Sequence, residues 1–94
     1  MKRFPYSPEE ASVLVHSYLE LRTCSSSFVR VRLMDISRNF KRLNWMERHS
    51  LYLIGVCHLT SREAGALMEI SHTHTLTWYN TARERLLDLL NGAD

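Results

Sequence analysis

The sequence predicts an all-α fold, a small helical domain of about five helices that ends in a helix-turn-helix. Its 94 residues include only three glycines and two prolines. Both prolines, Pro5 and Pro8, precede the first predicted helix, so little interrupts helices further on. Apolar residues make up 45% of the chain and recur at steps of three and four through most of it. A chain of this length buries one core without disulfides or metal.

The first helix is expected to start after Ser7 and to run to about Arg22. Ser7 supplies an N-cap hydroxyl, Pro8 suits the first helical position, and Glu10 is placed to close a capping box. The apolar stripe that follows consists of Ala11, Leu14, Val15, Tyr18 and Leu19. Residues 23–27 are rich in serine and form a turn between helices.

The second helix is predicted from Phe28 to Leu43, and the third, capped by Asn44, from Trp45 to His58. In the second, Val29, Leu33, Ile36, Phe40 and Leu43 form an apolar stripe. This stripe is either part of the domain core or, because of its heptad spacing, a homodimer seam. In the third, we expect a shared face formed by Met46, Ser50, Leu53, Ile54 and Cys57, with Cys57 as a small buried residue.

The last two helices are predicted to form the helix-turn-helix. Thr60 and Glu63 form a capping box at the start of the fourth helix, which is expected to bury Ala64, Leu67 and Met68. Gly65 lies inside this helix, where a small residue allows another helix to cross closely. The fifth helix spans about 72–90 and ends at Asn91–Gly92. We therefore expect one domain over 1–94, with an N-terminal helical hairpin (1–43) and a helix-turn-helix region (44–94).

Positive charge is concentrated in the middle of the chain. The net charge is only +2, but the segment from Arg22 to Arg48 has seven Lys or Arg against two acids, a formal +5. Such a block is typical of a surface for phosphates or for an acidic partner. The alternative is an ordinary solvated helix face.

A sequence pattern in the second half resembles a known family. It comprises Leu59, Thr60, Glu63, Leu67, Ile70, Ser71 and the run Ala82-Arg83-Glu84-Arg85-Leu86. This pattern, over about half of the chain, resembles region 4 of bacterial sigma factors, most closely the extracytoplasmic-function class. Two positions depart from it. Glu69 stands where the family usually has Gly, and Thr75 stands where it buries Val or Ile, so either the turn is one residue longer or Thr75 lies in the core.

The resemblance implies DNA binding by the last helix. Base contacts would come from His72, Thr73, Leu76, Thr77 and Asn80, and phosphate contacts from Arg62, Ser71 and Arg83. The family also docks on the β flap of RNA polymerase. The corresponding polymerase or partner surface would comprise Leu51, Ile54, Arg38, Lys41 and Arg42.

Nothing before Asn44 resembles the sigma region that grips melted promoter DNA. The chain is therefore similar to small transcription regulators of phages and mobile elements, such as late-gene activators, rather than to a complete sigma factor. Its expected partners are double-stranded DNA and bacterial RNA polymerase. One alternative is a module that binds polymerase or a sigma factor without reading DNA. Another is a helical phage packaging or structural protein.

Other functional classes have little support in the sequence. There is no Gly-rich phosphate loop and no recognisable catalytic set, so we expect no enzyme activity. Cys57-His58 and His72-x-His74 loosely resemble zinc ligands, but adjacent ligands on a helix point about 100° apart. We expect no metal and no other cofactor. The two cysteines lie in unrelated contexts, and no apolar run or signal peptide is present, so a reduced cytoplasmic protein without membrane contact is expected.

Overall fold

The N-terminal half consists of three helical segments in the computed structural model, which describes residues 5–92: α1 (Pro8–His16), α2 (Tyr18–Leu21) and α3 (Ser27–Phe40). Ser7 caps α1 by accepting a hydrogen bond from the Glu10 N–H (3.1 Å). The Glu10 carboxylate pairs instead with Arg32 of α3 (3.4 Å), so the expected reciprocal capping contact is replaced by a contact between helices. The predicted first helix breaks at Ser17, where the backbone leaves helical geometry (φ −104°, ψ 17°).

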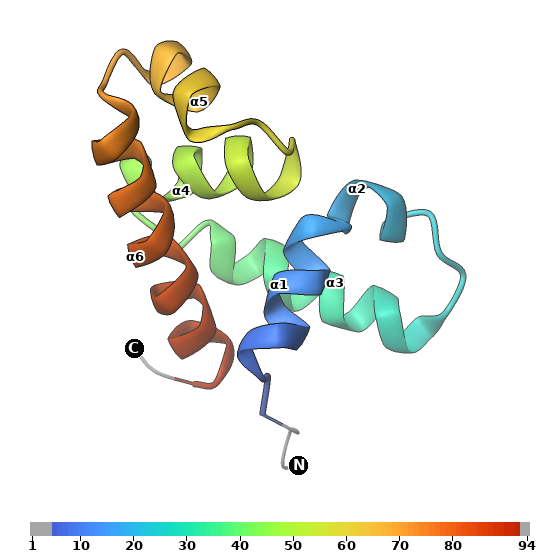
Figure 1. Ribbon diagram of the computed structural model, residues 1–94. Coiled ribbons are helices and arrows are strands. Elements are labelled where there is room, and N and C mark those ends of the chain that lie inside the picture. The colour runs from blue at the N-terminus through green and yellow to red at the C-terminus, as the bar shows by residue number, and fades with distance from the viewer. Residues whose placement is uncertain (1–4, 93–94) are drawn as a thin grey trace.

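The C-terminal half contains the predicted helix-turn-helix elements. α4 (Trp45–Ser50) continues into a π-helical segment, η1 (Leu51–Val56), and is followed by α5 (Ser61–Met68) and α6 (His72–Leu90). α6 is the longest helix and runs past α4 and α3, with α5 packed across its N-terminal end (Figure 1). No strand occurs within residues 5–92, so the all-α prediction is confirmed there.

The π-helical segment changes which side of the third helix is buried. In η1 the Cys57 N–H bonds to the Tyr52 carbonyl five residues back, and the wider turn rotates the later side chains. The fully buried residues of α4 and η1 are Glu47, Ser50, Leu51, Gly55 and Val56. Cys57 is exposed, so its expected burial is wrong. Leu51 is 1% exposed and lies in the core, so its assignment to a polymerase-docking surface is also wrong.

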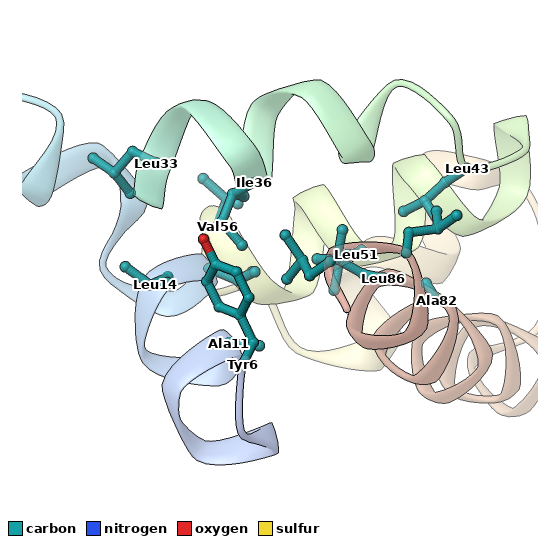
Figure 2. Packing of buried hydrophobic residues seen from close by; sticks show 13 residues of the cluster. Tyr6, Ala11, Leu14, Leu33, Ile36, Leu43, Leu51, Val56, Ala82 and Leu86 are labelled. Carbon is teal, nitrogen blue, oxygen red and sulfur yellow. The ribbon is translucent and has the colours of Figure 1, made fainter. Parts of the chain in front are cut away.

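The two halves of the chain share one hydrophobic core. Figure 2 shows side chains from the N-terminal segment, α1, α3, η1 and α6 gathering in it, including Tyr6, Leu14, Ile36, Leu51 and Leu86. The apolar stripe of α3 points into this core, with Val29 and Phe40 packed against its edge. The stripe therefore forms part of the domain core, the first of the two alternatives.

Two polar contacts tie the N-terminal segment to distant elements. The Tyr6 hydroxyl donates to the buried Asp35 carboxylate (2.8 Å), and both this hydrogen bond and burial raise the pKa of Tyr6 above its ordinary value, burial being the larger cause. The Tyr6 N–H donates to Asn91 Oδ1 (2.6 Å), and Asn91 Nδ2 donates back to the Tyr6 carbonyl (3.0 Å). These bonds hold the segment before α1 against the end of α6.

An ion pair anchors α6 on α4. Glu47 is buried and closes the capping box of α4, accepting from the Asn44 N–H at Oε1 (2.9 Å). The same oxygen accepts from Arg85 Nη1 of α6 (3.1 Å). Because a buried carboxylate without a cationic partner is costly, this contact opposes separation of the two helices.

We predict that Arg85→Met lowers the free energy of unfolding by about 2 kcal/mol, since it leaves the Glu47 charge buried and unpaired. Loss of a fully buried pair costs more, and the partial exposure of the Arg85 side chain reduces the figure. Urea denaturation followed by circular dichroism measures the change. Arg83→Met is the matched control, because Arg83 is exposed and forms no ion pair with a buried carboxylate within residues 5–92, and it should stay within about 0.5 kcal/mol of the parent. Equal effects of the two substitutions would contradict the anchoring role.

Candidate nucleic-acid interface

The turn between α5 and α6 is closed by its own backbone. Glu69 ends α5 in the left-handed conformation (φ 59°, ψ 38°). Its N–H donates to the Ala66 carbonyl (3.3 Å), and the Ile70 N–H donates to the Gly65 carbonyl (3.0 Å). This pair of bonds is a Schellman ending, which satisfies the last carbonyls of a helix and turns the chain sharply. Glu69 therefore adopts a conformation that favours glycine, at the position where the sigma pattern has glycine.

The two helices of the motif cross closely at Gly65. A Cβ atom on Gly65 would lie 2.9 Å from the Ile70 carbonyl oxygen and 3.0 Å from Thr75 Oγ1. Thr75 is fully buried, and its hydroxyl donates to the Ser71 carbonyl (2.9 Å). Of the two explanations for Thr75, burial in the core is correct. Its hydroxyl is tolerated there because it bonds to the helix backbone.

The residues expected to contact bases lie on the exposed side of α6. His72, Thr73, Leu76, Thr77 and Asn80 are all exposed. Because Thr73, Thr77 and Asn80 are spaced by four and three residues, they share one helix face. The Thr77 hydroxyl donates to the Thr73 carbonyl (3.1 Å), which leaves its oxygen lone pairs and its methyl group facing outward. This face thus presents donors, acceptors and two apolar groups of the kinds that distinguish base edges.

The residues expected to contact phosphates are also exposed. Arg62 is exposed in the first turn of α5. Ser71 caps α6 by accepting from the His74 N–H (3.1 Å), so its hydroxyl hydrogen is free to donate outward. The Arg83 guanidinium lies 5.5 Å from the centre of the Tyr79 ring.

The helix-turn-helix is not electropositive by itself. Residues 59–92 contain three arginines against four carboxylates, a formal charge of −1 with neutral histidines. One of these arginines, Arg85, pairs with Glu47. The excess positive charge of the protein lies instead in the segment from Arg22 to Arg48. The long-range attraction to DNA of residues 59–92 is therefore weak.

The residues expected to contact a partner are not a single surface. Ile54 is half-buried and lines a groove of about 790 Å³ between α1, η1 and α6. Arg38, Lys41 and Arg42 are exposed at the end of α3 and in the turn after it, and none of them lines this groove. Arg38 lies 3.6 Å from the Asp35 carboxylate. Because Leu51 is buried, two parts of the expected partner surface remain. They are Ile54, in the groove, and the three basic residues, which lie outside it.

The structure gives Arg85 a role that the sequence did not indicate, and it places Leu67 on the surface. In the run from Ala82 to Leu86, the first and last residues are buried and Arg85 binds Glu47, so the pattern mostly describes packing. The capping-box spacing of Asn44 and Glu47 indicates that the Glu47 side chain is held in place at the start of the helix. This spacing is the signal in the sequence that could have suggested Glu47 as a partner for Arg85. Leu67, expected to be buried, is 67% exposed, because Ala64 and Gly65 face α6 in its place.

The histidines and cysteines do not assemble into a metal site. Among the described residues there is no group of three or more His, Cys, Asp or Glu placed to hold an ion. His16 and His58 stack on each other with ring centres 4.0 Å apart, which joins α1 to the loop before α5. Within residues 5–92, no helix has the length and apolarity that crossing a membrane requires.

No protein-family model, curated protein or solved structure matches this chain. What bears on function is therefore the geometry of α5 and α6.

We predict that Glu69→Gly raises the free energy of unfolding by about 0.5–1 kcal/mol, because glycine adopts the left-handed conformation without steric cost. Thermal and urea unfolding measure the shift. Glu69→Ala removes the same carboxylate but keeps a Cβ atom, so it should not stabilise the protein. If both substitutions raised stability equally, charge rather than backbone conformation would explain the result.

Proposed function

We propose that the protein is a sequence-specific DNA-binding regulator of transcription, with α6 as its recognition helix. The observation that carries the proposal is the orientation of α6. Thr75 is buried against Gly65, and this fixes Thr73, Thr77 and Asn80 on the outside. A helix that projects in this way after a sharp turn fits the major groove, where polar side chains read base edges.

In the proposed complex, the first turns of α6 enter the major groove. Asn80 pairs with adenine, the Thr73 and Thr77 hydroxyls bond to base edges, and Leu76 contacts a thymine methyl group. His72 adds a ring nitrogen at the helix start. Arg62, Ser71 and Arg83 bind phosphates on either side and set the register of the helix in the groove.

We propose further that a protein partner assists DNA binding, and that RNA polymerase is this partner. The formal charge of −1 on residues 59–92 supports the need for such a partner. A region with so few cations contacts few phosphates and releases few counterions, so it gains little affinity for DNA by itself. A regulator of a phage or mobile element that binds promoter DNA together with polymerase would gain affinity from the second contact.

The same charge favours one alternative function, a module that binds polymerase or a sigma factor without reading DNA. The two functions differ in a direct test. A DNA reader enriches a defined site from a random duplex library, whereas the protein-binding module enriches none and co-purifies with polymerase.

We predict that Thr77→Ala and Arg62→Ala affect DNA binding differently. Thr77→Ala should change the preference at one base position by about tenfold, because a base contact carries sequence information. Arg62→Ala should weaken binding to all duplexes and lower the salt slope by roughly one unit. Fluorescence anisotropy on the enriched site and its single-base variants measures both effects.

Two exposed residues outside the helix-turn-helix provide matched controls for these variants. Thr23 bonds through its hydroxyl to the Glu20 carbonyl (2.9 Å), as Thr77 does to Thr73, and Arg22 is an exposed arginine like Arg62. Thr23→Ala and Arg22→Ala should leave DNA binding unchanged. If Thr77→Ala and Arg62→Ala bound every duplex as the parent does, the assigned interface would be wrong.

A further inference from the structure

The outer side of α3 combines large apolar side chains with positive charge. The exposed residues of α3 are Ser27, Phe28, Arg30, Val31, Met34 and Arg38. Half of them are large and apolar, with exposed fractions of 63% for Phe28, 58% for Val31 and 59% for Met34. Such a concentration on one helix of a small protein suggests that something covers it.

The apolar side chains form a single ridge, here called the α3 ridge and defined as Phe28, Val31 and Met34. Residues three apart on a helix form a row inclined to the helix axis, and a second helix packs its groove onto such a row. Arg30, four residues before Met34, and Arg38, seven residues after Val31, lie beside the ridge on the same side.

No acidic side chain is exposed on α3. Its only acidic residue, Asp35, is buried, accepts the Tyr6 hydrogen bond and forms an ion pair with Arg38 (3.6 Å). Arg32 is half-buried, pairs with Glu10, and places its guanidinium over the rings of both Tyr6 (4.3 Å) and the ridge residue Phe28 (5.0 Å). Lys41, exposed just after the helix, extends the positive surface. The outer side of α3 is thus apolar and positive, and a partner that fits it is apolar and negative.

We propose that the α3 ridge binds an amphipathic helix of another protein, whose apolar residues cover the ridge and whose carboxylates pair with Arg30, Arg38 and Lys41. This inference does not depend on DNA binding by α6. It identifies the partner by chemistry and by shape: a helix that crosses α3 at an angle and carries Asp or Glu beside its apolar stripe.

Two other occupants fit the ridge less well. Nucleic acid would pair its phosphates with the cations but leave three large apolar side chains uncovered. A bilayer requires apolar side chains along a line parallel to the helix axis. The ridge instead runs obliquely across α3, and the line through Met34 continues with the exposed charges of Arg38 and Lys41.

The test uses the full chain and a synthetic helical peptide of about 18 residues, long enough to form helix, with leucines along one face and glutamates beside them. An isomer of the same composition, in which leucines and glutamates alternate around the helix, is the control peptide. We expect the patterned peptide to bind with roughly micromolar Kd by fluorescence anisotropy, and the isomer at least about tenfold more weakly. Binding should weaken as salt is added.

Variants of the protein locate the site. The double variants Val31→Ser/Met34→Ser and Arg30→Glu/Lys41→Glu should each lose about tenfold or more in peptide affinity. These side chains are exposed, so the folded state should persist, and circular dichroism checks it. Leu67→Ser and Arg22→Glu change an exposed leucine and an exposed arginine elsewhere and should bind as the parent does. The Val31→Ser/Met34→Ser variant should keep the parent's affinity for DNA, which separates this inference from the proposed function.

Several results would overturn the inference. Equal binding of the patterned peptide and its isomer would indicate charge attraction alone, and unchanged affinity of the Val31→Ser/Met34→Ser variant would place the peptide elsewhere. Binding to anionic lipid vesicles or to duplex DNA that depends on the ridge, with no peptide binding, would assign the ridge to those partners. Self-association that the same variant abolishes would assign it to a second copy of this chain.

Discussion

The close approach of Gly65 to Thr75 is the contact on which the arrangement of the helix-turn-helix depends. The rotation of a helix about its axis decides which residue is buried, so the burial of Thr75 also decides which residues of α6 face outward. The absence of a Cβ atom at Gly65 permits the approach, and the left-handed Glu69 turns the chain so that α6 can make it. A larger side chain in this part of α5 would move α6 and with it the whole exposed face.

The far half of α6 is held by different forces. Ala82, Leu86, Leu89 and Leu90 lie in the common core, and Arg85 binds the buried Glu47 carboxylate. α6 is consequently anchored in the core along its C-terminal half, while its first turns expose side chains on the side away from Thr75. This division resembles the way in which known DNA-binding modules present a rigid helix end to the groove.

The sequence predicted the elements that depend on local interactions. The capping residues at 7, 44 and 60 mark helix starts because a side-chain oxygen binds a nearby N–H group. The sequence predicts the burial of a residue less well where tertiary contacts decide it. The π-helical turn of η1 shifts the buried face away from a 3.6-residue period, so Leu51 moves inward and Cys57 outward. Leu67 faces outward because Gly65 must face α6, which periodicity alone does not show.

In the two proposals, α6 reads DNA and the outer side of α3 binds a protein. Amide chemical shifts of the ¹⁵N-labelled protein, recorded while duplex DNA is added, test the central claim most directly. The account predicts that the largest changes occur at residues 71–80 and at Arg62, with residues 28–38 little affected. Changes concentrated in α3, or none at the start of α6, would contradict it.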